Sequence, residues 1–319
     1  MSGDFVVVFL ILLFVILILA AVLYYFFSVA FVKLNVGNPD NLDDPINKPL
    51  EKYKDAISKG LKYITETEHE WVYTVSEDGL RLAARYFPNN SDKTVILFHG
   101  YRSSAARDFS CAVEMYMKFG FNVLLCDQRS HGRSEGRLIT FGVKESRDVL
   151  VWIEFVSGHY GTEKILLGGM SMGATTVLLA SGLNLPPSVK GIVADCGFSS
   201  PIAIIKKVAK QSMKINAAPF IPFLNLYCKM FGKFSIYGAD TTKVLKNNKL
   251  PILLIHGAND GFVPCEMSKA ALEADPDNVR LVLVEGADHG LSYLINKELV
   301  EKEINSFLIK NFDFPLNSG

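Results

Sequence analysis

A serine held between two glycines is the residue of this sequence best placed for covalent chemistry. Residues 164–168 form an apolar run typical of a buried strand, residues 172–180 have the small and branched side chains of a buried helix, and Ser171 stands between them in a Gly-Met-Ser-Met-Gly turn. So tight a turn strains the backbone of its central residue, and the two glycines let neighbouring elements pack closely. The pattern predicts a nucleophilic Ser171 hydroxyl at the carboxyl end of a sheet. Because such a short pattern also arises by chance, the prediction depends on partners elsewhere in the chain.

A nucleophilic serine needs a base within hydrogen-bond reach, and that base needs a third group to fix its tautomer. His289 follows an apolar strand expected at 279–284, and Asp260 lies in the loop after another strand, expected at 252–255. The order serine, acid, histidine along the chain is the order of one hydrolase architecture. We therefore predict Ser171, Asp260 and His289 as nucleophile, acid and base.

Other residues at strand ends are rivals for two of these roles. His131 is the second candidate for the base, and Asp195 and Asp127 are rival acids, because each lies at or just after the end of an apolar strand. Asp288 adjoins His289, so its side chain is poorly placed to orient that ring.

Acyl transfer also needs hydrogen-bond donors aimed at the oxyanion. The backbone N–H of Met172 is one candidate, since this residue follows the nucleophile at the start of a helix. The N–H of Tyr101 is the other, because Tyr101 comes directly after a strand and a His-Gly pair at 99–100. The alternative for Tyr101 is an ordinary surface aromatic residue.

Apolar strands alternate with helical segments over most of the chain, which predicts an α/β fold with a parallel sheet covered by helices on both faces. A hairpin should precede it, since the Asp-Gly pair at 78–79 supplies the positive φ angles of a tight turn. Strands are expected at 71–75, 80–87, 94–98, 122–126, 164–167, 189–194, 252–255 and 279–285, and helices at 104–118, 143–156, 172–181, 267–274 and 298–310.

The alternation breaks at about 197–250, which we interpret as a helical cap inserted after the sixth strand. Two helices rich in large apolar residues are expected there, at 204–213 and 220–234. Residues 201–250 hold nine lysines and one acid, Asp240. The apolar residues could line an acyl-binding pocket and the lysines could face anionic headgroups. Equally, the lysines could be a solvated face and the apolar residues could only dock the cap.

Residues 5–32 contain no charge, and as a helix they would extend about 42 Å, more than the roughly 30 Å of bilayer hydrocarbon. We predict a transmembrane anchor at 1–35, with Tyr24 and Tyr25 near one interface. A cleaved signal peptide is the rival, but the chain lacks its basic start and small-residue exit. The lysines after the span weakly place the catalytic domain on the cytoplasmic side. An odd set of five scattered cysteines favours the same side.

Residues 36–50 have the prolines, asparagines and aspartates of a linker that would lift the domain off the membrane, and 51–68 are expected to form a charged edge helix. The predicted domains are therefore an anchor at 1–35, a linker and edge helix at 36–69, and a catalytic domain at 70–319. With 49% hydrophobic and 21% charged residues and no net charge, the composition is globular. It shows none of the basic balance of a nucleic-acid-binding protein.

Five short motifs together resemble the α/β-hydrolase fold superfamily, and more narrowly bacterial membrane-anchored serine hydrolases of the serine-aminopeptidase-like and Bem46-like groups. The resemblance covers about residues 70–312. The motifs are His-Gly-Tyr at 99–101, Asp-Gln-Arg-Ser-His-Gly-Arg-Ser at 127–134, Gly-Met-Ser-Met-Gly at 169–173, Asp-Gly-Phe-Val-Pro at 260–264 and Asp-His-Gly at 288–290.

This resemblance implies an eight-stranded, mostly parallel sheet with an antiparallel second strand, a lid after strand six, and hydrolysis of esters, thioesters or amides without a cofactor. It implies the same triad and the same oxyanion donors. One departure is the Arg-Ser-His-Gly-Arg-Ser segment at 129–134, where many relatives have Arg-Gly-x-Gly-x-Ser. This departure bears on the shape of the loop beside the pocket.

The anchor and the apolar cap favour a lipid-like or acyl ester as substrate. A peptidase or amidase is the second interpretation, although the cap lacks an acidic cluster to bind a free amine. A non-catalytic binding module is the third, and the presence of all three triad residues argues against it. No cluster of Cys, His or carboxylates has metal-ligand spacing, so neither a metal nor a cofactor is expected.

Overall fold

The computed structural model describes residues 3–33 and 37–312. Both ends of the predicted anchor (1–2 and 34–35), the first residue of the predicted linker and the last seven of the predicted catalytic domain (313–319) lie outside the described residues.

The centre of the protein is an eight-stranded, mostly parallel sheet, as predicted. Its strand order is β1-β2-β4-β3-β5-β6-β7-β8, and β2 runs antiparallel to both of its neighbours while the remaining pairs are parallel. The strands are β1 (Glu70–Val75), β2 (Arg81–Phe87), β3 (Lys93–Phe98), β4 (Asn122–Asp127), β5 (Lys164–Met170), β6 (Val189–Asp195), β7 (Ile252–Gly257) and β8 (Val279–Val284).

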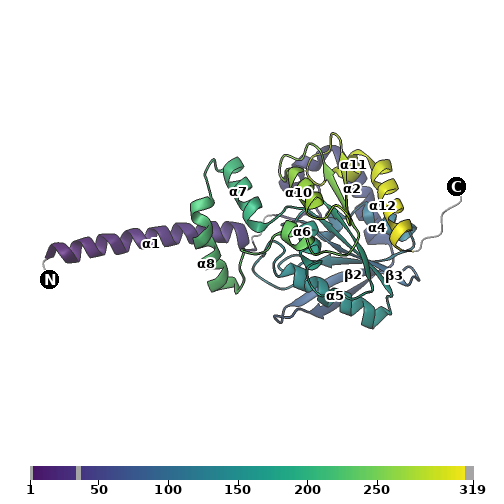
Figure 1. Ribbon diagram of the computed structural model, residues 1–319, viewed down its shortest axis with the longest axis horizontal. Helices are drawn as coiled ribbons and strands as arrows, with labels where there is room; N and C mark the ends of the chain where they lie inside the picture. Colours follow the sequence, from purple (N-terminus) through teal and green to yellow (C-terminus); the bar gives the residue numbers. More distant parts are fainter. Residues whose placement is uncertain (1–2, 34–36, 313–319) are drawn as a thin grey trace.

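Helices cover both faces of the sheet (Figure 1). One face packs against α5 (Glu145–Tyr160), α6 (Met172–Ala180) and α10 (Glu266–Ala274), and the other against α2 (Lys54–Glu66), α4 (Ala112–Lys118) and α12 (Lys297–Asn311). The strands serve both layers because successive side chains point to opposite faces. In β3, for example, Ile96 and Phe98 join the first layer, while Val95 and Leu97 join the second.

The helix predicted at 104–118 is wrong in one respect, since it is interrupted. The chain forms α3 (Ala105–Asp108), turns at 109–111 and resumes as α4. Phe109 is buried in the core at this turn, and the Ser110 carbonyl lies against Gly60 of α2, where a Cβ atom would come within 2.2 Å of it. Tertiary packing therefore breaks a helix that its composition favours.

The amino-terminal segment is a single helix, α1 (Gly3–Phe31), which is long and apolar enough to cross a membrane, a property that signal sequences share. Its side chains are exposed from Phe5 to Leu19, whereas Phe27 and Phe31 are 1% and 0% exposed because the catalytic domain covers them. Beyond the helix, Lys33 N–H donates to the Arg137 carbonyl at 2.7 Å. The end of α1 is thus docked directly on the domain.

The segment predicted as a spacer does not hold the domain away from α1. It lies on the domain surface, where it includes a 3-10 helix, η1 (Pro45–Tyr53), and leads into α2. Asn47 Oδ1 accepts a hydrogen bond from Arg107 at 2.7 Å, and the Ser104 hydroxyl donates to Asp40. These side-chain contacts, which the composition of the segment does not reveal, explain the difference.

The predicted cap is present between β6 and β7. It consists of α7 (Pro201–Ser212), η2 (Ala218–Phe220), α8 (Ile221–Gly232) and α9 (Thr241–Leu245). Figure 1 shows α7 and α8 beside the end of α1 that is nearer the sheet, so these two helices of the cap lie between the free length of α1 and the sheet. The short helix α11 (Ser292–Ile295) follows β8 and leads into α12.

Candidate active site

Ser171 occupies the turn between β5 and α6 with φ +54° and ψ −113°, a left-handed conformation that non-glycine residues rarely adopt. The turn is possible because the residues two before and two after Ser171 are glycines, which have no side chain to separate the neighbouring backbones. A Cβ atom on Gly173 would lie 1.7 Å from the Phe98 carbonyl oxygen, and one on Gly169 would lie 2.3 Å from the Gly173 carbonyl oxygen. The glycines therefore let β3, β5 and α6 meet closely enough to hold the serine at the strand ends.

His289 and Asp260 approach Ser171 from the loops after β8 and β7. His289 Nε2 is 2.9 Å from Ser171 Oγ, and His289 Nδ1 is 2.7 Å from Asp260 Oδ2. The three predicted triad residues thus form one hydrogen-bonded chain. The ring of Phe262 stands edge-on to the imidazole, with centroids 5.1 Å apart.

Asp260 is held as a carboxylate on both of its oxygens. Oδ1 accepts the backbone N–H groups of Phe262 (2.9 Å) and Val263 (2.7 Å), and Oδ2 lies 3.3 Å from His256 Nε2 in addition to its bond with His289. Burial alone raises the pKa of Asp260, but the hydrogen bonds from the two histidines outweigh it and hold the pKa well below its usual range. Asp260 therefore lies beside the His289 ring as a charged carboxylate.

The two backbone N–H groups predicted as oxyanion donors belong to residues near Ser171, since Met172 follows it directly and a Cβ atom on Gly100, the neighbour of Tyr101, would lie 3.3 Å from Ser171 Cβ. Met172 is the first residue of α6, so its N–H has no carbonyl one turn earlier to bond. Tyr101 N–H donates to no other described residue. The Gly100–Tyr101 peptide is fixed through the Gly100 carbonyl, which accepts from His99 Nδ1 (2.8 Å) and Ser103 N–H (3.3 Å). Since a peptide unit is planar, these bonds also restrain the direction of Tyr101 N–H on one side.

Known structures share this fold. An esterase of Pyrococcus furiosus, Pf2001, superimposes with a TM-score of 0.64 at 28% identity, over 78% of this chain and 95% of that chain. Residues 89–234 match the family described as Serine aminopeptidase, S33. This chain is a hydrolase of the α/β-hydrolase superfamily.

Two curated proteins extend the likeness. The hydrolase is 25% identical to YqkD of Bacillus subtilis, an uncharacterized protein, over 224 residues, which are 69% of this chain and 72% of YqkD. It is 23% identical to the bifunctional esterase/perhydrolase DCH of Acinetobacter calcoaceticus over 277 residues, 74% of this chain and 99% of that protein.

The rival residues of the hydrolase have other partners. His131 Nε2 accepts the Arg102 N–H at 3.1 Å, and its ring makes no hydrogen bond to Ser171. Burial lowers the pKa of His131 well below its usual value, so it stays neutral and acts as a support for the loop. Asp127 accepts the Arg133 N–H at 2.9 Å and closes a turn. Asp195 binds the Ser171 N–H through its carbonyl oxygen, at 2.8 Å, while its carboxylate accepts from Ser292.

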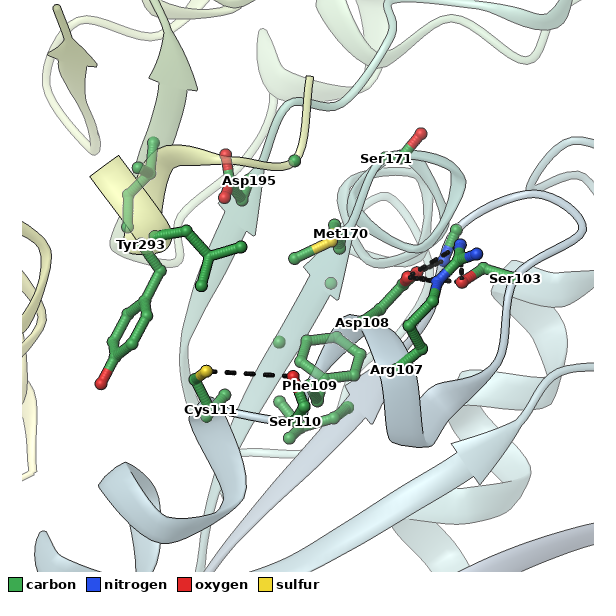
Figure 2. Close-up of a pocket in the computed structure, with 18 of the residues that line it drawn as sticks. Ser103, Arg107, Asp108, Phe109, Ser110, Cys111, Met170, Ser171, Asp195 and Tyr293 are labelled. Carbon is green, nitrogen blue, oxygen red and sulfur yellow. Dashed lines mark hydrogen bonds and ion pairs between the residues drawn. The ribbon is translucent and has the colours of Figure 1, made fainter. Parts of the chain in front are cut away.

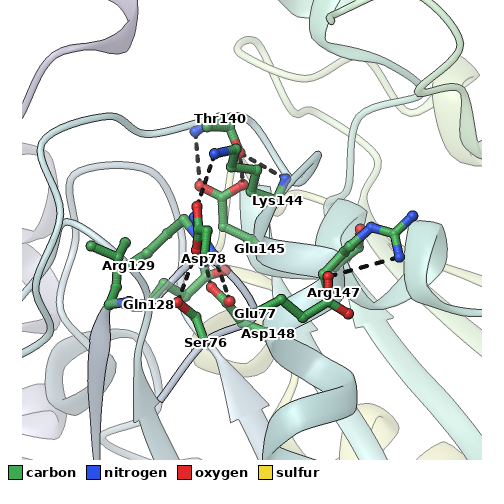
Figure 3. Close-up of polar contacts among 12 residues, drawn as sticks. Ser76, Glu77, Asp78, Gln128, Arg129, Thr140, Lys144, Glu145, Arg147 and Asp148 are labelled. Carbon is green, nitrogen blue, oxygen red and sulfur yellow. Dashed lines mark hydrogen bonds and ion pairs between the residues drawn. The ribbon is translucent and has the colours of Figure 1, made fainter. Parts of the chain in front are cut away.

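A buried ion-pair cluster holds the loop that carries His131, and sequence reasoning did not identify it (Figure 3). Arg129 pairs with Asp148 at 2.6 Å and with Asp78 at 3.1 Å. Ser130, which stands where many relatives have glycine, adopts φ +67°, and its hydroxyl donates to the Leu138 carbonyl at 2.8 Å. The departure from the family motif therefore keeps the left-handed turn and adds a side-chain bond.

A cavity of about 280 Å³ leads from Ser171 along the face of the sheet that packs on α2, α4 and α12. Figure 2 shows Phe109, Met170 and Tyr293 along it, with the Ser103, Arg107 and Asp108 cluster at one side. Its wall includes no residue of 197–250, which favours the second of the two interpretations of the cap, in which the apolar residues only dock it. The apolar cap residues pack on α1 instead. The interrupted helix α3–α4, which turns Phe109 inward, supplies much of the wall.

Cys196, Asp260 and His289 bring three potential metal-ligand atoms within 4.8 Å of one another. The carboxylate and imidazole are already bonded in the triad. Burial raises the pKa of the Cys196 thiol well above its usual value, whereas metals bind the thiolate. The chemistry of this donor set therefore suits proton transfer better than metal binding.

Because α6 packs so closely on β3 at Gly173, a substitution at this residue tests whether the turn needs a glycine there. We expect Gly173→Ala to lower the free energy of unfolding by about 3 kcal/mol or more, because its Cβ would meet backbone that cannot move aside. Gly158→Ala, in α5, is the control: no atom lies within 4 Å of its Cβ position, so it should stabilise by about 0.5–1 kcal/mol. Thermal unfolding of both variants measures this, and equal stabilities would contradict the packing account.

The raised pKa of Asp195 predicts that the free energy of unfolding depends on pH. Burial raises its pKa to about 6, above the roughly 3.9 of an unfolded chain. The folded state then binds the proton more tightly between these values, so the free energy of unfolding should fall by on the order of 2 kcal/mol as pH rises from about 4 to 6. Chemical unfolding across this range, compared with Asp195→Asn, measures the difference. The variant should lose this part of the slope, and an unchanged slope would show that another group titrates.

Proposed function

We propose that the protein is a membrane-anchored serine hydrolase that cleaves carboxylic esters of the lipid-like or acyl ester class through an acyl-enzyme. The observation that carries the proposal is the chain of hydrogen bonds from Ser171 Oγ through His289 to Asp260, set beside two backbone N–H groups. A hydroxyl, a neutral base and a fixed carboxylate in this geometry are the parts that acyl transfer requires.

The mechanism follows from these positions. His289 Nε2 takes the Ser171 proton as Oγ forms a bond to the carbonyl carbon, and the Tyr101 and Met172 N–H groups stabilise the negative oxygen. His289 then gives that proton to the leaving alkoxide as the ester C–O bond breaks, which releases the alcohol. Water, deprotonated by the same ring, then attacks the acyl carbon. The bond from this carbon to Ser171 Oγ breaks, His289 returns the proton to Oγ, and the acid is released. Asp260 keeps the Nδ1 proton in place and stabilises the imidazolium throughout.

Support for an ester as substrate comes from the cavity and from the relatives. The cavity beyond Ser171 is lined largely by apolar residues such as Phe109, Met115 and Ile304, which suit an acyl chain better than a charged group. Pf2001 is an esterase, and DCH is an esterase/perhydrolase. We therefore place the acyl chain along this cavity.

Support for membrane attachment comes from how α1 and the cap are exposed. About 20 helical residues cross bilayer hydrocarbon, so residues 5–23 of α1 would fill most of it, and Tyr24 and Tyr25 would meet the interface. The outer face of α8 beside this level carries Phe223 and Met230, 50% and 63% exposed. Together with the cap lysines, this face suits the headgroup region. We retain the anchor at 1–35, the connecting segment at 36–69 and the catalytic domain at 70–319, on the cytoplasmic side.

The experiment is hydrolysis of p-nitrophenyl esters with short, medium and long acyl chains by the full chain in lipid nanodiscs, beside matched aminoacyl p-nitroanilides. The full chain is needed because Phe27 and Phe31 are buried against the domain. We expect ester turnover with a preference among chain lengths. Turnover of the anilides alone would replace the ester proposal with the amidase interpretation, and no turnover by folded protein would remove both.

A further inference from the structure

The end of α1 is bonded to the loop that carries one proposed oxyanion donor. A helix leaves its last four carbonyl groups without partners inside the helix, yet all four are satisfied here, two of them by side chains of the loop at 101–102. The bonds run from Val32 N to Ser28 O (3.1 Å), from Arg102 Nη2 to Val29 O (2.7 Å), from the Tyr101 hydroxyl to Ala30 O (2.8 Å) and from Ile139 N to Phe31 O (2.7 Å).

Arg102 is placed so that it serves both the helix and the loop. The last turn of α1 contains no basic residue of its own, and the Arg102 guanidinium places a cation beside the negative end of its dipole. Its backbone has φ +53°, and its N–H is bonded to His131. A side chain held by α1 and an N–H held by His131 stabilise a conformation that would otherwise relax.

Aromatic packing joins the same elements. The Tyr101 ring stacks on Phe141 with centroids 5.1 Å apart, and Phe31 of α1 packs edge-on against the same Phe141 ring, with centroids 5.2 Å apart. Met172, the residue of the second proposed donor, belongs to the same buried cluster as Phe27 and Phe31. Both donor residues therefore rest on side chains that α1 completes.

We propose that the end of α1 is part of the active-site scaffold, with the side chains of Tyr101 and Arg102 acting as positioning residues that aim the Tyr101 N–H at the oxyanion. This inference rests on the proposed function of Ser171. The helix that would anchor the protein then also completes its oxyanion hole, so turnover depends on α1 being docked. The Tyr101 hydroxyl and the Arg102 guanidinium bond to carbonyls of α1 and make no hydrogen bond to Ser171, so in this proposal they act through the loop.

The test compares the double variant Tyr101→Phe, Arg102→Gln with Tyr227→Phe in the full chain in nanodiscs. Tyr227 is the matched control, because its hydroxyl also donates to a carbonyl of α1, Ala20 O at 2.9 Å, but from the cap. Gln at 102 leaves the cost of the positive φ unchanged. The readouts are kcat and KM for an ester, the thermal midpoint, and the affinity of a trifluoromethyl ketone, which forms a charged tetrahedral adduct with the serine.

We expect the double variant to lose about tenfold or more in kcat and a similar factor in ketone affinity, with KM and thermal midpoint close to those of Tyr227→Phe. Equal kcat and equal ketone affinity in the two proteins would overturn the inference. The inference would also be overturned if the double variant lost kcat only because it unfolds. In that case the thermal midpoint would fall, and the ketone affinity per folded molecule would stay unchanged. Failure of the proposed function itself is distinguishable, because the wild type would then show no turnover that depends on Ser171.

Discussion

We expect Ser171→Ala to lower kcat for ester hydrolysis by about 10⁴-fold or more, while KM and the thermal midpoint stay near those of the wild type. Oγ is the only atom removed, and its hydrogen bond is to His289. Alanine has the same Cβ as serine, so the cost of φ +54° at this turn does not change. Initial rates with a p-nitrophenyl ester and a melting curve on the same sample measure the effect.

Ser181→Ala is the matched control for this prediction, since Ser181 follows the other end of α6 and its hydroxyl donates only to the Leu178 carbonyl. It should retain activity close to that of the wild type. A Ser171→Ala protein that keeps a tenth of the wild-type kcat would mean that another group attacks the substrate.

We expect the second large loss of kcat when Asp260, the proposed acid of the triad, is replaced. Asp260→Asn should lower kcat by about 10⁴-fold with little change in fold. The amide oxygen of asparagine will face the Phe262 and Val263 N–H groups, because these two donors leave no room for an NH₂ group. The NH₂ group then points at His289 Nδ1 and forces the ring proton onto Nε2. That nitrogen faces Ser171 and can no longer accept its proton.

The variant Asp195→Asn tests whether Asp195, the rival candidate, is the acid of the triad in place of Asp260. The Asp195 carboxylate is bonded to Ser292 and makes no hydrogen bond to His289, so we expect the variant to stay within about tenfold of the wild-type kcat. Measured side by side, the two asparagine variants should differ by about a thousandfold. A reversed order would assign the acid to Asp195.

The triad could be predicted from the sequence because its residues follow strands. Parallel strands end at one edge of the sheet, so Ser171 after β5, Asp260 after β7 and His289 after β8 were expected to meet, and the structure brings them together. Strand periodicity and glycine spacing are local properties that a sequence displays directly.

The features that could not be predicted depend on contacts between distant segments. Tyr101 was singled out for its backbone N–H, but nothing local shows that its hydroxyl reaches Ala30, 71 residues away. The turn at Phe109 that shapes the cavity depends likewise on the packing of Gly60 against Ser110. The same composition of the cap could line a pocket or cover α1, and only the direction in which its helices leave the sheet decides between them.

The most direct test of the central claim is labelling of the full chain in nanodiscs with a fluorophosphonate, with the modified residue located by mass spectrometry. The account predicts a single phosphonylated residue, Ser171, whose labelling is absent in Ser171→Ala and strongly slowed in His289→Ala. An adduct on a different residue, or no adduct on a folded wild-type protein, would contradict an activated serine at this turn.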